Sequence, residues 1–384
     1  MKPISRRGYI GGSVAFMAAA FSQNPLSLFG FPNDESGAEV VPFLDPQPVD
    51  PGRRMIKWED LQEWITPAND LFAVNHYGVV SEVDASKWTL DVSGFVGRPQ
   101  RFSLQEIQSR RRREITATIE CSGNGAGVGF MGAVGNARWA GTPLGPLLKE
   151  CSLLPQSSEI VFFGQDEKKE KIRDQEYPQN FARSLSTEEA FKKEILLCWE
   201  MNGKPLTQGH GFPLRLVVPG WYGIAWVKWL NRIEVHDRRY MSKFMARDYV
   251  TIRGEERDGK TIWRETSVSH MNVKSLLGRV SRLKDGSIRI TGAAWTDGTP
   301  LKRVELQIDE GPWIKVELDR SRQSRYAWTF WSYEWKNPPP GEHTLVSRAT
   351  DANGVVQPSK DDPAIKLKKT YWEANQQYPR RIKV

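Results

Sequence analysis

The sequence predicts an α+β protein of two domains, in which a β-sandwich forms the C-terminal third. Its length of 384 residues leaves room for two domains, and 39% hydrophobic with 26% charged residues is ordinary for a globular protein. From about Val268 onward, short alternating strand patterns such as "SIRITGAAW" and "HTLVSRATD" are separated by Asp-Gly, Gly-Pro and Asn-Gly turns. Short strands with frequent turns are typical of a β-sandwich, so we expect one there.

The N-terminus has the pattern of an export leader. In "SRRGYIGGSVAFMAAAF", Arg6 and Arg7 precede a short apolar run, and a small-residue cleavage site follows. Paired arginines in this position predict the twin-arginine route to the periplasm, which carries proteins already folded and often loaded with a cofactor. The apolar run over 9–21 is short for a bilayer, so a permanent membrane span is not expected. We assign residues 1–40 to this leader and a linker.

A single cysteine marks the end of one predicted strand. Before it, Ile115, Ala117 and Ile119 alternate with polar residues, which predicts a half-buried strand that ends at Cys121. Glycines follow at positions 123, 125 and 127, and glycine lets a backbone approach a ligand closely. A cysteine at the mouth of such a loop indicates a binding site. The alternative is a buried cysteine that packs as a small hydrophobic residue beside a glycine turn.

Cysteine usage and charge exclude several other classes of protein. The chain has three cysteines, and Cys151 and Cys198 lie in apolar helix-like or strand-like surroundings and are expected in the core. An odd count without close spacing describes neither a disulfide framework nor a zinc site, and no CxxCH motif for a covalently attached haem is present. The net charge of +8 favours an anionic substrate or an acidic partner. The arginine run 110–113 lacks interleaved aromatics, so no nucleic-acid partner is expected.

A second stretch concentrates groups that could bind an anion. "GHGFPLRLVVPGWYGIAWVKWL" places His210, Arg215 and Lys228 around a Pro-Gly turn. Arginine and lysine beside a histidine and glycine loops are suited to gripping a phosphate. The alternative is a buried β-hairpin whose basic residues extend to solvent and whose tryptophans belong to the core.

Five segments, taken in order, carry a family resemblance. They are "TATIECSGNGAG", "GAVGNARWAGTPLGPLL", "FARSLSTEEAF", "EMNGKPL" and "HGFPLRLVVPGWYG". Together they resemble the molybdenum-cofactor domain of the sulfite oxidase family, and most of all its exported bacterial branch of sulfite and sulfane dehydrogenases. The resemblance runs from about residue 55 to the C-terminus. It implies a mixed α/β molybdopterin-binding catalytic domain over 41–265 and an immunoglobulin-like β-sandwich over 266–384 that makes a homodimer.

The resemblance also implies roles for individual residues. Cys121 would be a thiolate ligand of molybdenum, because thiolate is a soft donor suited to a metal held by the dithiolene sulfurs of the pterin. Asn75 and His76 would lie near the pterin and the metal, and Asp166 would contact the pterin. The body and phosphate of the cofactor would be held by His210, Arg215 and Lys228. No haem is expected on this chain.

Fewer residues are implied for the reacting centre. Family members that oxidise sulfite line the pocket with a tyrosine and with an arginine near the C-terminus, and here Tyr249 and Arg381 match them, with Arg380 as neighbour. The family's oxidases carry arginine just before the Asn-His pair, where this chain has Val74. Loss of a guanidinium removes a bidentate partner for a small oxyanion, so we expect weaker sulfite turnover or another sulfur substrate. Arg138 is a candidate to supply the charge instead.

These implications favour a periplasmic enzyme that oxidises sulfite, or a related reduced sulfur compound, by oxo transfer and passes electrons to an external cytochrome c. Two alternatives stay open. One is a molybdopterin-dependent sulfoxide reductase, although the related methionine sulfoxide reductases lack an appended sandwich. The other is a non-catalytic exported binding protein with a degenerate cofactor domain, which Val74 favours and the intact Cys121, Arg215 and Lys228 oppose.

Overall fold

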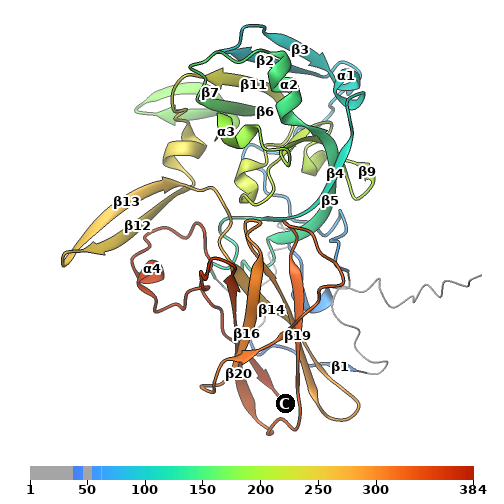
Figure 1. The fold of residues 1–384 in the computed structure, drawn as a ribbon, viewed down its shortest axis with the longest axis vertical. Coiled ribbons are helices and arrows are strands. Elements are labelled where there is room, and N and C mark those ends of the chain that lie inside the picture. The colour runs from blue at the N-terminus through green and yellow to red at the C-terminus, as the bar shows by residue number, and fades with distance from the viewer. Residues whose placement is uncertain (1–37, 46–53, 62, 128) are drawn as a thin grey trace, which may run out of the picture.

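The computed structural model shows two bodies built mainly of strands, with the first domain above and the second below in Figure 1. The described residues are 38–45, 54–61, 63–127 and 129–384. The predicted leader, with Arg6 and Arg7, lies outside them. Within the part of the chain that the structure describes, no helix combines the length and apolar character needed to cross a membrane.

The first domain consists of two sheets that share one core. One has the strand order β10-β8-β5-β4, with β9 beside β8, and the other has the order β3-β2-β11-β6-β7. The pairing is antiparallel except between β11 and β2. The bounds in the first sheet are β4 Arg113–Glu120, β5 Val134–Pro143, β8 Leu196–Met201, β9 Lys204–Pro205 and β10 Arg215–Val217. The bounds in the second are β2 Thr89–Gly94, β3 Gln100–Ser103, β6 Glu159–Ile172, β7 Gln175–Ser186 and β11 Leu230–His236.

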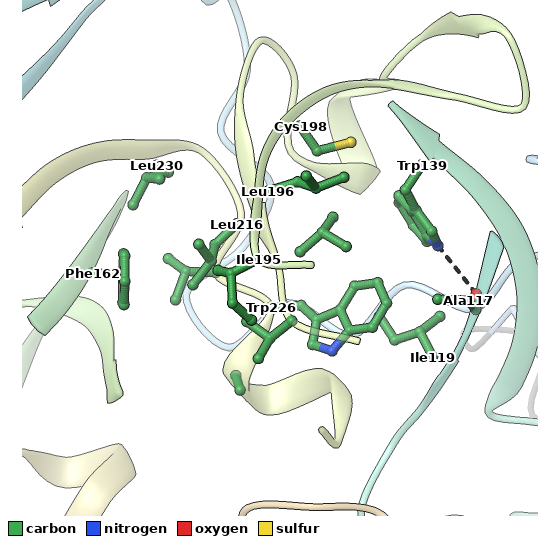
Figure 2. Close-up of a cluster of buried hydrophobic side chains, with 14 of the residues drawn as sticks. Ala117, Ile119, Trp139, Phe162, Ile195, Leu196, Cys198, Leu216, Trp226 and Leu230 are labelled. Carbon is green, nitrogen blue, oxygen red and sulfur yellow. Dashed lines mark hydrogen bonds between the residues drawn. The ribbon is translucent and has the colours of Figure 1, made fainter. Parts of the chain in front are cut away.

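Buried side chains from both sheets form one hydrophobic cluster, part of which is drawn in Figure 2. Trp139 of β5 and Leu196 of β8 belong to it together with Phe162 of β6 and Leu230 of β11. The indole Nε1 of Trp139 donates to the carbonyl of Ala117 at 3.2 Å, so this large ring is buried with its one polar atom satisfied. The cluster therefore fixes β4 relative to β10, the strands that carry two parts of the site.

Helices are few and short, so the domain that the resemblance describes as mixed α/β is mainly β. The apolar run around Cys198 forms strand β8 rather than a helix, and its buried pattern on both faces suits a central strand. A capping box of Ser103 and Glu106 starts α1. The α-helices are α1 Leu104–Gln108, α2 Leu144–Glu150, α3 Thr187–Ala190 and α4 Pro363–Lys366. The other turns are 3-10 helices η2 Trp58–Asp60, η3 Gln208–His210 and η4 Gly223–Ala225 and the π-helical turn η5 Lys243–Arg247.

The second body contains the sheets predicted for the C-terminal third. One antiparallel sheet has the order β1-β14-β15-β19-β18 and the other has the order β17-β16-β20-β21. Val280 and Ile290 from the first sheet share a core with Val304 and Leu345 from the second, so the sheets pack as a sandwich. The strands are β14 Lys274–Arg282, β15 Ile288–Trp295, β16 Leu301–Ile308, β17 Ile314–Lys315, β18 Glu317–Leu318, β19 Thr329–Trp335, β20 Glu342–Asp351 and β21 Arg380–Lys383.

The N-terminal described segment packs on the sandwich. Strand β1, Glu39–Val40, pairs with β14, and Phe43 forms a bridge with Ile382 of β21. Val41 and Phe43 are buried in the sandwich core. The first residues of the segment assigned to the catalytic domain therefore lie against the second body.

The two bodies are in direct contact. Trp58 stacks on Trp295 of β15 with ring centroids 6.2 Å apart. The backbone N–H of Trp328 donates to Oγ1 of Thr118 in β4 at 2.8 Å. A hairpin projects from the junction in Figure 1, made of β12 Val250–Arg257 and β13 Lys260–Ser267. The sandwich thus covers the strand that leads to Cys121.

Candidate cofactor and active site

One cleft of the first domain gathers nearly all of the predicted site residues. The space inside it, including its open mouth, is about 690 Å³. The predicted residues that line it are Asn75, His76, Cys121, Asp166, His210, Arg215, Lys228 and Tyr249. Side chains that are far apart in the sequence therefore face one common space.

Cys121 stands where β4 ends and the glycine loop begins. Its backbone N–H donates to the carbonyl of Ala133 at 2.9 Å, and its carbonyl accepts from the N–H of Asn124 at 2.9 Å. Gly125 has a φ of +87°, which side chains rarely adopt, so the loop requires glycine at this turn. Cys121 is half-buried and lines the cleft.

Lys228 is held by three oxygen atoms at the edge of the cleft. Its ammonium donates to the carbonyls of Val74 at 2.9 Å and Gly209 at 3.2 Å, and to the side-chain oxygen of Asn75. Burial, with a smaller contribution from Arg215, lowers the pKa of Lys228 to about 7. An anion bound in the cleft would favour the charged ammonium.

Arg215 of β10 is buried beside two tryptophan rings. Its guanidinium carbon lies 4.9 Å from the ring centre of Trp139 and 5.9 Å from that of Trp226. Nη1 donates to the carbonyl of His210 at 3.1 Å, and Nη2 donates to the carbonyl of Trp226 at 3.0 Å. Nε has no partner among the described residues, and burial lowers the pKa of the group to about 10. The side chain is fixed in orientation, and its Nε–H is left for a ligand.

His210 and Asp166 carry further polar atoms that the described residues leave without partners. Nδ1 of His210 lies 2.7 Å from Oγ1 of Thr207, while its buried Nε2 has no partner. Burial, followed by Arg215 and Lys228, lowers the pKa of His210 to about 4. Asp166 sits where β6 loses register with β7, and this bulge turns its carboxylate into the cleft. Burial raises the pKa of Asp166 to about 6, and its Oδ1 also lacks a partner.

These features fit a polar, anionic cofactor. Buried polar atoms are nearly always hydrogen-bonded, yet Oδ1 of Asp166, Nε2 of His210 and Nε of Arg215 are satisfied by none of the described residues. The cleft offers the cations of Arg215 and Lys228 against the carboxylate of Asp166. A phosphate needs fixed cationic donors, and a pterin ring needs both donors and acceptors. The residues present therefore fit molybdopterin, and a thiolate such as that of Cys121 would be a suitable donor to its metal.

Tyr249 and His76 form an aromatic wall of the cleft. The hydroxyl of Tyr249 lies 3.1 Å from Nε2 of His76. Tyr249 has a φ of +58°, which is uncommon outside glycine, so contacts around it must fix this turn. Burial, followed by Lys228 and Lys243, lowers the pKa of His76 to about 4, whereas burial raises the pKa of Tyr249. Both rings are therefore uncharged at neutral pH.

Arg381 does not belong to this site, which corrects the expectation for it. It lies on β21, the strand that pairs with β20 at the edge of the sandwich, and its side chain lies 3.7 Å from Glu342. Its neighbour Arg380 is buried and pairs with Asp45 at 3.0 Å. The C-terminal strand pairs within the sandwich instead of returning to the cleft, so neither arginine reaches it.

The valine that departs from the family pattern does face the cleft. Val74 lines it with 38% of its surface exposed, so an arginine at this position would reach the mouth. Arg138 is exposed on β5 and is not part of the lining, so it does not replace the missing charge.

Sequence reasoning missed the C-terminal segment 371–376, which closes over the cysteine loop. The ring of Trp372 stacks on Tyr249 with centroids 4.1 Å apart. The N–H of Ala374 donates to the carbonyl of Ser122 at 3.1 Å. No local pattern marks these residues, because their contacts depend on how the chain returns from the sandwich.

Arg183 of β7 was also missed. Its side chain is fully buried, and its Nη atoms donate to the carbonyl of Phe244 and, at 2.5 Å, to the carbonyl of Val268. Val268 in turn donates its N–H to the carbonyl of Tyr249 at 2.9 Å. Arg183 therefore ties together the backbone on both sides of the turn that presents Tyr249. A basic residue directly after the apolar pair Phe181 and Ala182 is the one signal that the sequence offers for it.

Two family models match this chain. The oxidoreductase molybdopterin binding domain matches residues 76–244, and the Mo-co oxidoreductase dimerisation domain matches residues 265–372. Human mitochondrial sulfite oxidase is 31% identical over 334 residues, which cover 80% of this chain and 60% of the human protein. The chain belongs to the sulfite oxidase family of molybdopterin oxidoreductases.

Other family members agree with this assignment. Sulfite oxidase of Arabidopsis thaliana is 26% identical over 343 residues, which cover 80% of this chain and 86% of the plant protein. Among solved structures, the sulfane dehydrogenase SoxCD from Paracoccus pantotrophus superposes with a TM-score of 0.72 at 26% identity, covering 89% of this chain and 87% of that one. The family member described here spans about 60% of the length of its human mitochondrial relative.

Proposed function

We propose that this protein is a molybdenum-dependent oxidoreductase that oxidises sulfite, or a related reduced sulfur compound, and passes electrons to an external cytochrome c. One observation carries the proposal. The sulfur of Cys121 shares a cleft with Asp166, His210 and Arg215, each of which holds a buried polar atom that no described residue satisfies. The names of the relatives, sulfite oxidase and sulfane dehydrogenase, support the same chemistry.

In this proposal the chain binds and orients, and the molybdenum cofactor supplies oxygen-atom and electron transfer when bound. Cys121 would donate a thiolate to the metal and Arg215 would donate to the phosphate. Lys228, whose three donors are engaged by the protein, would add a positive charge beside it. His76 is neutral at neutral pH because burial lowers its pKa to about 4, so it shares a hydrogen bond with the Tyr249 hydroxyl. That bond holds the hydroxyl at the cleft, which both residues line, so the hydroxyl lies where it can act on a substrate oxygen.

Val74 bears on the choice of substrate. A guanidinium at this position would be a bidentate partner for a small oxyanion, whereas valine gives an apolar wall. Sulfite therefore binds weakly, or the physiological substrate is a reduced sulfur compound that carries less charge. The structural neighbour is a sulfane dehydrogenase, which supports the second possibility.

The test uses the full chain produced in a host that makes molybdopterin. Molybdenum is measured by mass spectrometry, and initial rates are measured with sulfite, thiosulfate and a sulfoxide, with cytochrome c or a dye as the redox partner. We expect stoichiometric molybdenum and oxidation of at least one sulfur donor. Full sulfite activity in molybdenum-free protein would sink the proposal. Reduction of the sulfoxide alone would favour the reductase alternative, and loaded protein with no activity would favour the binding-protein alternative.

The assembly and location belong to the same proposal. The sandwich would be immunoglobulin-like and would join two copies, which the match to the dimerisation-domain model supports. Sedimentation analysis should give twice the mass of one chain, and a single-chain mass would contradict this.

Export by the twin-arginine route to the periplasm rests on Arg6 and Arg7 in the sequence. Replacing both by lysine should hold loaded enzyme in the cytoplasm, and unchanged export would show that they are not the signal.

A further inference from the structure

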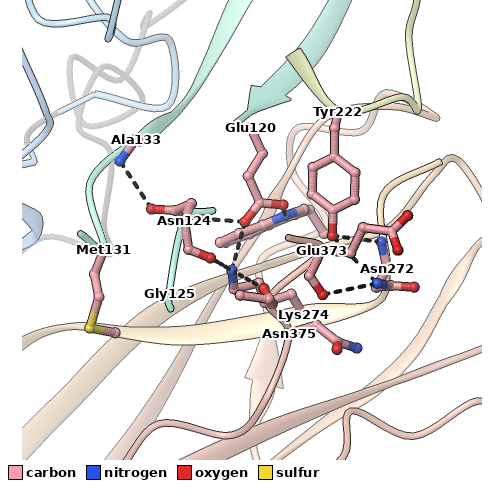
Figure 3. Close-up of polar contacts among 12 residues, drawn as sticks. Glu120, Asn124, Gly125, Met131, Ala133, Tyr222, Asn272, Lys274, Glu373 and Asn375 are labelled. Atoms are coloured by element: carbon pink, nitrogen blue, oxygen red, sulfur yellow. Dashed lines mark hydrogen bonds and ion pairs between the residues drawn. The ribbon is translucent and has the colours of Figure 1, made fainter. Parts of the chain in front are cut away.

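A lysine of the sandwich is inserted into the loop that carries Cys121 (Figure 3). Lys274, at the start of β14, is completely buried. Its ammonium donates to Oε1 of Glu120 at 2.7 Å, to the carbonyl of Ala374 at 2.8 Å, and to the carbonyl of Asn124. An ammonium has three N–H donors, so all of them are used.

The carboxylate that Lys274 meets is equally well satisfied. Oε1 of Glu120 also accepts from Nδ2 of Asn124 at 3.0 Å, and Oε2 accepts from Nε1 of Trp295 at 2.8 Å. The side-chain oxygen of Asn124 accepts from the N–H of Ala133 at 3.0 Å. Glu120 directly precedes Cys121 in the chain, so this network grips the residues on both sides of the cysteine.

The loop that follows Cys121 lies close against the ammonium of Lys274. A Cβ atom at Gly125 would lie 2.8 Å from Nζ of Lys274, so a side chain there would push the ammonium from its place, and the φ of +87° disfavours a side chain as well. On the other side of the loop, Nε2 of Gln376 donates to the carbonyl of Gly125 at 2.7 Å. The sandwich and the C-terminal segment therefore hold the cysteine loop from two directions.

Stability does not explain why an ion pair should occupy this position. Taking two charges out of water costs free energy that their attraction repays only in part, and well-packed apolar residues often serve as well or better. A fully hydrogen-bonded buried pair does, however, admit few alternative arrangements of the groups around it. The Lys274–Glu120 pair is thus suited to fixing a geometry.

We propose that Lys274 is a positioning residue for Cys121: through Glu120 and Asn124 it fixes the loop so that the thiolate faces the cofactor. The second domain then completes the metal site and is more than a surface for pairing two copies. The inference rests on the proposed role of Cys121 as a molybdenum ligand. Partners that orient a metal ligand commonly change metal affinity by about 10-fold to 100-fold when they are lost.

The experiment compares three full-length variants. Lys274→Met leaves the Glu120 carboxylate buried without its counterion and can unfold the chain, so the double variant Glu120→Gln with Lys274→Met removes both charges together. The matched control is Arg279→Met, on the same strand β14. Arg279 bonds to the carbonyls of Glu59 at 2.8 Å and Leu61 at 2.7 Å, and neither residue belongs to the cysteine loop.

Two quantities are measured beside the melting temperature. The first is molybdenum per chain, which should fall about 10-fold or more in the double variant and stay normal in the Arg279→Met control. The second is the alkylation rate of Cys121 in cofactor-free protein, followed by mass spectrometry with buried Cys151 and Cys198 as internal references. A loosened loop should raise that rate severalfold at an unchanged melting temperature.

The outcomes separate this inference from the proposed function. A double variant that loads molybdenum and alkylates like the parent would overturn the positioning role. Equal losses in the double variant and in Arg279→Met would overturn it as well, because they would show general loosening between the domains. If the parent protein binds no molybdenum, the proposed function fails, and the alkylation rates still decide whether Lys274 fixes the loop.

Discussion

The hydroxyl of Tyr249 lies 3.1 Å from Nε2 of His76, and both side chains line the cleft that contains Cys121. Tyr249 reaches this position through a turn with a φ of +58°. Arg183 ties the neighbouring backbone, and the ring of Trp372 covers the tyrosine ring. From this uncommon backbone conformation, held by several contacts, we predict that the placement of the hydroxyl matters for function.

Tyr249→Phe should therefore separate chemistry from cofactor binding. We expect molybdenum content to stay at the parental level while kcat/KM for the sulfur substrate falls by about 100-fold, the lower end for a positioned proton-transfer group. Stability should fall by about 1–3 kcal/mol, because Nε2 of His76 is left buried without a partner. Tyr378→Phe, at a partly buried tyrosine outside the cleft, is the matched control. Normal turnover in Tyr249→Phe would remove the hydroxyl from the mechanism.

Val74→Arg tests the substrate. The carbonyl of Val74, not its side chain, is what Lys228 binds, so the substitution leaves that contact in place. One added charged hydrogen bond is worth roughly 1.5–3 kcal/mol, so KM for sulfite should fall by about 10-fold to 100-fold. Val79→Arg, exposed and outside the lining of the cleft, controls for added surface charge. No gain on sulfite at position 74 would point to a different substrate.

The sequence predicted those strands and turns that a pattern of neighbouring residues marks. Alternation of Ile115, Ala117 and Ile119 marked β4, and frequent turns marked the C-terminal sheets. Alternation also predicted an exposed polar face for β4, and this part was wrong. Thr118 and Glu120 are both fully buried, because the sandwich covers that face and supplies partners for their oxygens. A polar residue in a strand shows only that it needs a partner, not whether the partner is water.

The path of the C-terminus and the burial of Lys274 could not be predicted, because they depend on contacts between distant parts of the chain. The family resemblance supplied the residues of the cleft, but not the path of the C-terminus. Arg381 was therefore expected at the cleft, whereas β21 pairs with β20 in the sandwich and Trp372 stacks on Tyr249. Lys274 reads as an ordinary residue at the start of a strand. Its burial follows only from the docking of the two bodies, which no local pattern records.

Arg215→Met should lower cofactor retention more than turnover per bound molybdenum. Loss of a charge-assisted contact to phosphate is worth roughly 1.5–3 kcal/mol, which weakens binding by about 10-fold to 100-fold. Methionine keeps most of the bulk beside Trp139, and this limits the cost to packing. Arg232→Met is the matched control, since Arg232 also covers an aromatic ring, that of Phe163 at 4.0 Å, but does not line the cleft. Normal molybdenum content with reduced turnover would instead place Arg215 at the substrate.

Protonation of Glu189 at low pH should lower the stability of the folded protein. Its carboxylate accepts from Nε1 of Trp221 at 2.9 Å and from Lys192 at 2.5 Å, and it lies 3.7 Å from His270. Burial alone would raise its pKa, but these donors lower it to about 2. The folded pKa is thus below the unfolded value of about 4.3, so the stabilisation is present above that pH and is lost as the pH falls toward 2.

Glu189→Gln should therefore lower the melting temperature at pH 6 and 7, and the difference from the parent should shrink below pH 4. Glu188→Gln, at the exposed neighbouring position, should show no such difference at any pH. If the difference in melting temperature between the parent and Glu189→Gln stayed constant from pH 3 to pH 7, the charge of Glu189 would not be what stabilises the protein at this position.

Substitution of the three cysteines should show which of them is a ligand. Burial raises the pKa of Cys151 to about 11 and that of Cys198 to about 12, so both remain thiols at neutral pH and neither lines the cleft. Cys121→Ser should fold and keep pterin through Arg215 and Lys228, yet support no turnover, because a harder oxygen donor changes the electronics of the metal.

Cys198→Ser, in contrast, should lower stability and leave turnover intact. Cys198 is completely buried, so a smaller and more polar hydroxyl there costs stability even though it can still donate to the carbonyl of Glu200. We expect a loss on the order of 1 kcal/mol, or a few degrees in melting temperature, while turnover per molybdenum stays normal. Released pterin is measured by fluorescence, beside molybdenum content and rate. If Cys121→Ser turned over normally, its sulfur would be a packed thiol in the glycine loop, and the metal would need another ligand from this chain.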